Sequence, residues 1–271
     1  MLFKITDKNY KLYLETGDTI MINLSKIVAA AAIIVSAAVV APANASVIQL
    51  GFILDDSGSI GSGNYNIIKS GLADAINTYV PVDSSYEISV VAFSSSATTV
   101  VSHMLIDSVA TRTSVANSIL ADPYDGNSTA MDTAFNAMSS ALTGSSLSDI
   151  VSTYVTFATD GIPDSQAAAT TARDNMITNA GVDNLSIEAI GSGVNATYLQ
   201  NTICYPQACD TTQPYNFPAQ GFYIPVADAQ GYADAISYKL QVVTGHVPEP
   251  ASLALLGIGL AGLGAMRRRK A

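Results

Sequence analysis

Between residues 47 and 243, apolar runs of strand length alternate with segments in which apolar residues have helical spacing. The first run, Val47 to Asp55, is apolar up to its acidic end, as is typical of a parallel strand buried on both faces. Strands that alternate with helices predict an α/β domain with a doubly wound, mostly parallel sheet and helices on both faces. Six strands are expected at 47–55, 86–93, 98–105, 150–159, 185–190 and 221–226, with helices at 65–79, 108–120, 129–142, 165–180, 195–201 and 228–243.

The second and third expected strands are separated only by Ser94, Ser95 and Ser96. So short a connection allows a tight turn but not a crossover helix, so these two strands should pair antiparallel. One edge strand of the otherwise parallel sheet is therefore expected to run the other way. The helix ends carry matching signals, with Gly181 as a stop and Asp228 as a cap.

Residues 21–45 have the layout of a secretory signal peptide. Lys26 supplies a positive charge, residues 27–40 form an apolar run, and an Ala-Asn-Ala sequence ends at Ala45. This layout predicts cleavage between Ala45 and Ser46. A membrane anchor or a buried helix is the alternative, and the short apolar run and the small-residue ending weigh against it.

Residues 1–20 are polar, mixed in charge and without a hydrophobic pattern, and they fit poorly in front of a signal peptide. We therefore expect Met21 to be the true start and residues 1–20 to be an extension that is dispensable or not translated. Once both ends of the chain are set aside, residues 46–244 form one domain of about 200 residues, enough for a single packed core.

The C-terminal segment, residues 245–271, has three parts in a fixed order. The motif Pro248-Glu249-Pro250 precedes an apolar run at 251–266, and the basic sequence Arg-Arg-Arg-Lys follows that run. The apolar run is slightly short for a bilayer, which needs about 20 residues, and the basic cluster would stay on the cytoplasmic side. This order resembles the PEP-CTERM sorting signal. The resemblance implies a Gram-negative source that makes exopolysaccharide, a transient inner-membrane anchor, and recognition by an exosortase that removes the tail. A plain C-terminal anchor is the alternative.

The predicted domain is strongly acidic. Residues 46–247 hold four Lys and Arg against 18 Asp and Glu, which gives a net charge of −14. A domain with this charge is not steered to nucleic acid or to anionic lipid, and the charge suits an exported protein. The two cysteines, Cys204 and Cys209, lie in an inserted loop at 203–220. In an exported protein they favour a small structural disulfide over a metal site.

A segment rich in oxygen donors, Asp55-Asp56-Ser57-Gly58-Ser59, follows the first expected strand. In an open α/β sheet, ligands bind at the carboxyl ends of the strands, so this segment lies where binding sites are built. The carboxylate of Asp55 and the hydroxyls of Ser57 and Ser59 suit a hard cation such as Mg²⁺. Taken alone the pattern is a weak signal, because turns are rich in the same residues.

Two further loops at the same edge of the sheet strengthen the metal hypothesis. Thr129 precedes an expected helix, and Asp160 follows the expected strand at 150–159. With the first segment they offer an oxygen-only set of carboxylates and hydroxyls that suits Mg²⁺, with Mn²⁺ or Ca²⁺ as alternatives. This set does not fill the roughly six positions that Mg²⁺ requires, so water or a partner's carboxylate must complete the shell.

These segments carry a family resemblance. Residues 47–244 resemble a von Willebrand factor type A domain with its metal-ion-dependent adhesion site, whose motif is Asp-x-Ser-x-Ser, then Thr, then Asp. The matching segments are 52–59, 127–129 and 157–161, in that order.

The resemblance implies five residues that bind the ion directly or through water: Asp55, Ser57, Ser59, Thr129 and Asp160. Ser128 could take the role of Thr129, although the Ala134-Phe135 pair that follows favours Thr129. The loop around the two cysteines is not part of the common pattern of the family.

These expectations favour an exported, non-enzymatic adhesion protein. Its ion would hold an acidic group of a protein or a polysaccharide, at the cell envelope or in the extracellular matrix. An enzyme, such as a metal-dependent hydrolase, is one alternative, but neither His103 nor His246 falls in the predicted site loops. The other alternative is a structural protein of an exopolysaccharide matrix, whose ion site is vestigial or purely stabilising.

Overall fold

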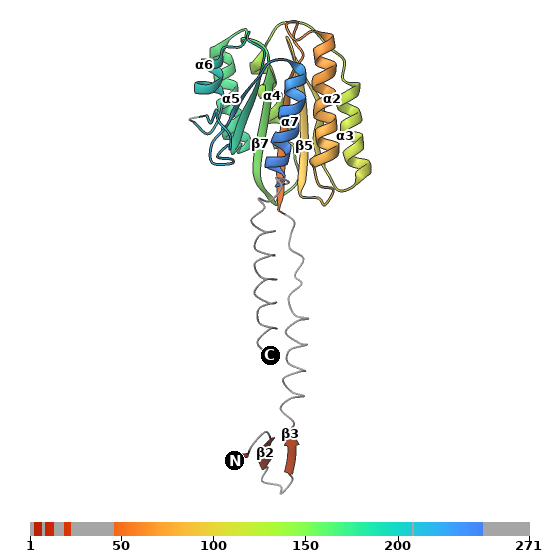
Figure 1. Ribbon diagram of the computed structural model, residues 1–271, viewed down its shortest axis with the longest axis vertical. Helices are drawn as coiled ribbons and strands as arrows, with labels where there is room; N and C mark the ends of the chain where they lie inside the picture. The colour runs from red at the N-terminus through yellow and green to blue at the C-terminus, as the bar shows by residue number, and fades with distance from the viewer. Residues whose placement is uncertain (1–2, 7–8, 14–18, 23–45, 208, 246–271) are drawn as a thin grey trace, which may run out of the picture. The chain divides into compact units, whose positions relative to one another are not determined.

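Figure 1 shows the protein as a computed structural model, which describes residues 3–6, 9–13, 19–22, 46–207 and 209–245. The chain divides into two compact units, Met1–Asn44 and Ala45–Ala271, which we describe separately. In the first unit, three strands form an antiparallel sheet: β1 (Phe3–Thr6), β2 (Asn9–Tyr13) and β3 (Thr19–Ile22). Strand β3 includes Met21, and the translation start at this residue stays a prediction. The rest of the predicted signal peptide lies outside the described residues.

The second unit is built on a mixed sheet with these strands: β4 (Val47–Asp55), β5 (Tyr86–Phe93), β6 (Ala97–Leu105), β7 (Ile150–Thr159), β8 (Asn184–Ile190) and β9 (Tyr223–Val226). Their order in the sheet is β6-β5-β4-β7-β8-β9. All neighbours are parallel except β5 and β6, which form the predicted antiparallel hairpin at one edge. The predicted α/β fold is therefore confirmed, with its six strands and its one antiparallel edge strand.

Helices cover both faces of this sheet (Figure 1). One face carries α2 (Ser62–Tyr79), α3 (Val109–Ala121) and α7 (Ala229–Val243). The other face carries α4 (Met131–Thr143), α5 (Gln166–Ala180), the short α6 (Ala196–Tyr198) and the π-helix η1 (Leu199–Ile203). Successive side chains of β4 enter the two cores in turn, Phe52 on the first face and Ile53 on the second. This double cover explains why the strand is apolar at consecutive positions.

Three helices differ from the predicted ones. Helix α2 begins at Ser62, three residues before its expected start. The helix expected from residue 129 begins at Met131, because the two preceding residues bond to other loops. The Ala130 N–H donates to the Ser94 carbonyl at 2.8 Å, and the Thr129 carbonyl accepts from the Asp164 N–H at 3.0 Å. The helix expected at 195–201 is instead α6 followed by η1, which extends to Ile203.

The expected C-terminal segment begins just after α7, the last helix of the fold. Its motif Pro248-Glu249-Pro250 and its apolar run at 251–266 lie outside the described residues. Within the described part of the chain, no helix has the length and apolar character needed to cross a membrane.

Candidate metal centre at the carboxyl edge of the sheet

Asp55, the last residue of β4, is held by two hydrogen bonds. Its Oδ1 accepts from the backbone N–H of Ser57 at 2.9 Å, and its Oδ2 accepts from the Thr159 hydroxyl at 2.5 Å. Thr159 ends β7, the strand beside β4, so two adjacent strands fix one carboxylate. Each carboxylate oxygen has a further lone pair, which leaves Asp55 able to accept an additional interaction.

Ser59 connects the first loop to the end of β7. The Ser59 hydroxyl donates to Asp160 Oδ1 at 2.7 Å, and its oxygen lies 3.2 Å from the Ser57 hydroxyl oxygen. Residues separated by about a hundred positions in the sequence therefore meet at the carboxyl edge of the sheet. Ser57 is buried, whereas Ser59 is exposed and Asp160 is partly exposed, so the group opens to solvent on one side.

Thr129 lies against the loop that carries Asp160. A Cβ atom added to Gly161 would lie 3.2 Å from the Thr129 hydroxyl oxygen, so the two residues are in close contact. The Thr129 N–H also donates to Asp164 Oδ1 at 3.2 Å, in addition to the backbone bond between these residues. Thr129 is buried and its neighbour Ser128 is exposed. The structure thus brings the side chains of all five predicted ligands to one edge, on three loops in contact.

Backbone bonds tie the first loop to the loop before α4. The Gly58 N–H donates to the Asn127 carbonyl at 2.7 Å, and the Gly126 N–H donates to the Asp56 carbonyl at 3.0 Å. A Cβ atom at Gly58 would lie 3.1 Å from the Gly126 carbonyl oxygen, so a side chain there would press the loops apart. Glycine at this position therefore keeps Ser57 and Ser59 close to the loop of Thr129.

Four other acids lie near the site, and each accepts a hydrogen bond within the domain. Asp164 accepts from Thr129 as described, and Asp125 accepts from the Ser94 hydroxyl. Asp122 Oδ2 accepts from the Tyr65 hydroxyl at 2.5 Å.

Asp56 is the fourth of these acids and the most buried. Only 4% of the residue is exposed, and its Oδ2 accepts from the Asp125 N–H at 3.2 Å. Its Oδ1 has no hydrogen-bond partner. Its position inside the Asp-x-Ser-x-Ser segment gave no sign of this burial.

Burial raises the pKa of the site carboxylates. It raises the pKa of Asp55 to about 6, and the neighbouring charge of Asp160 adds to the rise. Burial also raises the pKa of Asp160. The ion pairs among the described residues form elsewhere, within α5 and between α7 and β8. A bound cation would supply the positive charge that the pair of site carboxylates lacks.

The donor set fits a hard divalent cation. It consists of carboxylate and hydroxyl oxygens, which Mg²⁺, Mn²⁺ and Ca²⁺ prefer over nitrogen or sulfur. Among the described residues, no three His, Cys, Asp or Glu side chains form a group that could hold a metal ion. An ion at this edge would therefore depend on the hydroxyls of Ser57, Ser59 and Thr129 as well as on two carboxylates.

Cys204 and Cys209 form a disulfide in the loop after η1, with their Cα atoms 6.1 Å apart. The Arg173 guanidinium fastens this loop to α5, because it donates to the carbonyls of Ile203 and Cys204 at 2.8 and 2.9 Å. These contacts support a structural role for the cysteine pair.

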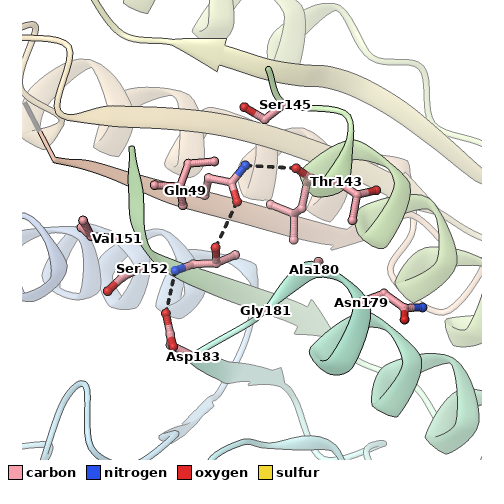
Figure 2. Close-up of a pocket in the computed structure, with 12 residues that line it drawn as sticks. Gln49, Thr143, Ser145, Val151, Ser152, Asn179, Ala180, Gly181 and Asp183 are labelled. Carbon is pink, nitrogen blue, oxygen red and sulfur yellow. Dashed lines mark hydrogen bonds between the residues drawn. The ribbon is translucent and has the colours of Figure 1, made fainter. Parts of the chain in front are cut away.

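A cavity of about 460 Å³ lies at the opposite edge of the sheet, near the amino ends of β4 and β7 (Figure 2). At its floor, Gln49 donates to the Leu142 carbonyl at 3.1 Å and accepts from the Thr153 hydroxyl at 3.0 Å. His103 is also near this edge, since a Cβ atom at Gly144 would lie 3.4 Å from its ring. Neither the cavity nor His103 belongs to the candidate metal centre.

Comparison with known families identifies both predicted segments. Residues 49–221 match the model of the von Willebrand factor type A domain, and residues 246–270 match the model of the PEP-CTERM protein-sorting motif. Curated proteins compared by sequence give no match.

Solved structures share the fold at low sequence identity. Proximal thread matrix protein 1 from the mussel byssus is similar with a TM-score of 0.58 and 16% identity, over 73% of this chain and 48% of that one. The pilus adhesin SpaC from Lactobacillus rhamnosus GG has a TM-score of 0.56 and 11% identity, over 74% of this chain and 31% of that one. The match thus spans less than half of either relative. Another structure of the mussel protein, with a TM-score of 0.55, 16% identity and coverage of 74% and 46%, has a zinc-occupied MIDAS motif.

Proposed function

Because the chain belongs to the von Willebrand factor type A domain family and carries a PEP-CTERM sorting motif, we propose that it is an exported adhesion protein without enzymatic activity. Its domain would hold one divalent cation, Mg²⁺ or a similar ion, and use that ion to bind an acidic group of a partner. The ligands would be Asp55, Ser57, Ser59, Thr129 and Asp160. The observation that carries this proposal is the contact of three loops that present two carboxylates without a basic partner, one buried and one partly exposed, beside three hydroxyls.

Each part of the site has a distinct task in this proposal. Asp55 provides negative charge from the floor, where Thr159 keeps its carboxylate in place. Ser59 and Asp160 stand at the open side and would exchange their mutual hydrogen bond for contacts to the ion. When bound, the ion would supply a positive centre that attracts a carboxylate from outside.

The known relatives support this proposal in two ways. The mussel matrix protein holds zinc at its own MIDAS motif, so a similar fold accommodates a divalent ion at such a motif. By name, the mussel protein is a thread matrix protein and the pilus protein is an adhesin. An attachment role also agrees with a sorting motif, which implies processing by an exosortase and delivery to the cell envelope or beyond.

The proposed route to the cell surface has three steps. The signal peptide at 21–45 would direct export and be cleaved before Ser46. The segment at 245–271 would then anchor the protein transiently in the inner membrane of a Gram-negative cell until its tail is removed. The disulfide between Cys204 and Cys209 suits the oxidising environment outside that membrane.

Titration calorimetry with Mg²⁺ and Mn²⁺ tests the ion site directly. The full-length protein in a non-ionic detergent should bind one ion. Thr129→Ala and Ser59→Ala should each weaken binding by about tenfold or more, since each removes a ligand from a small set. Ser128→Ala, which changes the exposed neighbour of Thr129, should bind the ion like the unaltered protein. A folded protein that takes up no ion would refute the proposal.

A purely stabilising ion is the competing role, and the exposure of Ser59 argues against it. A stabilising ion is best enclosed by protein, whereas an ion beside Ser59 would keep a side open to solvent. With Mn²⁺ bound, acetate at high concentration should change the relaxation rate of water protons, because acetate displaces water that is coordinated to the ion. If acetate leaves the relaxation rate of water protons unchanged, the result would favour the structural role in a matrix.

A further inference from the structure

The carboxyl edge of the sheet is negative beyond what a divalent ion can offset. The loops at 56–61, 94–96, 122–130, 160–165, 191–195 and 227–228 contain no Lys, Arg or His. In addition to the proposed ligands, these loops carry further acids: Asp56, Asp122, Asp125, Asp164 and Asp228. Three of these, Asp125, Asp164 and Asp228, are exposed. A divalent ion would match the charges of Asp55 and Asp160, and Lys69 lies close to Asp122. The three exposed acids would stay uncompensated.

The rest of the domain offers no free cation to balance this edge. Residues 46–245 contain four Lys and Arg side chains, and all of them donate hydrogen bonds within the fold: Lys69, Arg112, Arg173 and Lys239. Lys69, Arg173 and Lys239 are buried, with exposed fractions of 5%, 9% and 4%. Arg112 donates to the Val80 carbonyl at 2.7 Å. A bound ion would therefore be the main positive feature on the described surface of the domain.

One apolar side chain stands beside the site. Six large hydrophobic residues are exposed in the described part of the chain, and of these only Ile162 belongs to a loop of the carboxyl edge. It is 54% exposed and follows Asp160 and Gly161. An exposed isoleucine next to an ion site offers a contact for an aliphatic or aromatic side chain of a partner.

Resting on the proposed ion site, we infer that its partner is a basic protein surface, which presents a single carboxylate beside an apolar side chain, and not an acidic polysaccharide. The carboxylate would reach the ion and the apolar side chain would pack on Ile162. Lysines or arginines around them would face Asp125, Asp164 and Asp228. A polyanion would also offer a carboxylate, but each of its other charges would meet this negative edge.

The distance over which exposed charges interact depends on ionic strength, so the inference can be tested by varying the salt concentration. Exposed charges interact over about 10 Å at 0.1 M ionic strength and over about 3 Å at 1 M. The preference for a basic partner should thus be large at low salt and shrink at high salt, whereas the contact between ion and carboxylate is short and less screened.

Three probes separate the partner classes in binding titrations with Mg²⁺ present. Two are peptides of equal length with one Glu beside one Leu, in which the other positions are Lys in the first peptide and Ser in the second. The third is a short oligogalacturonate. At about 50 mM salt, the full-length protein in non-ionic detergent should bind the Lys peptide about tenfold more tightly than the Ser peptide, and the oligogalacturonate least. Near 500 mM salt the difference between the peptides should fall to about twofold.

Variants assign the preference to the proposed groups. Asp125→Asn keeps an oxygen for the Ser94 hydroxyl and should reduce the preference for the Lys peptide by about twofold, while Asp74→Asn, an exposed acid on α2, should not. Ile162→Ser should weaken both peptides alike. In the Lys peptide, Glu→Gln should abolish the part of the affinity that depends on Mg²⁺.

The outcomes also separate this inference from the proposed function. If calorimetry finds no ion, the proposed function fails and the inference falls with it. If the ion binds but the oligogalacturonate matches or exceeds the Lys peptide, or the Lys peptide does not bind, the inference is wrong and the ion site stands. The inference is also wrong if the Lys peptide binds equally well without Mg²⁺ and with Glu→Gln in the peptide.

Discussion

The Asp56 carboxyl group is buried inside the first loop of the site, and burial raises its pKa to about 6. In the unfolded chain the same group releases its proton near pH 4. The folded protein therefore holds this proton more tightly between about pH 4 and pH 6. Because the native state binds more protons in that window, its free energy of unfolding should fall as the pH rises through it. In EDTA, urea unfolding should show this loss, about 2 kcal/mol for Asp56, with Asp55 adding to it.

Asp56→Asn isolates the contribution of this residue. Asparagine can still accept from the Asp125 N–H but does not titrate, so the variant should have a shallower pH dependence and a higher stability at pH 7. Asp74→Asn, on the exposed side of α2, is the control for the loss of one acidic side chain outside the site. The same pH dependence in Asp56→Asn and the unaltered protein would mean that Asp56 does not hold a proton in the folded state.

The resemblance to the von Willebrand factor type A motif selected the five proposed ligands, and the preference of a hard cation for oxygen donors agrees with that choice. The residues that support them were not predictable in the same way. Thr159 bonds to Asp55 across a separation of 104 positions, and Asp56 is buried by a loop more than 60 positions away. Such contacts depend on which strands become neighbours, and local sequence does not encode that order.

Helix α7 is joined to the sheet by a buried ion pair. Lys239 Nζ lies 2.9 Å from Glu188 Oε1 of β8, and the two side chains are 4% and 0% exposed. Burial raises the pKa of Glu188 and lowers that of Lys239. Lys239→Met should leave the Glu188 charge buried without a partner, so we expect a loss of about 3–5 kcal/mol in the free energy of unfolding, measured by urea denaturation at pH 7.

The double variant Lys239→Met/Glu188→Leu provides the control for this prediction. With both charges removed, most of the lost stability should return, because no buried charge is left without a partner. If the double variant is no more stable than Lys239→Met, the loss comes from packing around position 239 and not from an unpaired charge.

Helical spacing was a good guide to the apolar side of α7 but not to this pair. Four apolar side chains at helical spacing, Ala229, Tyr232, Ile236 and Leu240, are buried, and Ala233 packs against α2 at Gly71. The spacing does not predict that Lys239 is buried, because its acidic partner Glu188 belongs to a strand 51 positions earlier. The start of α4 was misplaced for the same kind of reason, because bonds to Ser94 and Asp164 keep Thr129 and Ala130 in the loop.

At the scale of the whole molecule, patterns that need no knowledge of strand neighbours were read correctly from the sequence. Alternation of strands and helices gave the fold class, and the order of motif, apolar run and basic tail gave the sorting segment. Net charge is a property of the same kind. Net charge could not reveal that the four Lys and Arg side chains of residues 46–245 bond inside the fold, which makes the described surface of the domain more uniformly negative than its composition indicates.

A uniformly negative surface makes the stability of the domain sensitive to salt in two distinguishable ways. Repulsion among exposed acids is screened by any salt, so KCl should raise the melting temperature gradually as the screening length falls from about 30 Å at 0.01 M to about 10 Å at 0.1 M. Mg²⁺ should add a further rise at millimolar concentration, because an ion bound only by the folded state stabilises it by mass action. Thr129→Ala should keep the response to KCl and lose the additional rise with Mg²⁺. If the variant responds to Mg²⁺ like the unaltered protein, the ion acts on the acidic surface as a whole and not at the loops of Asp55 and Asp160.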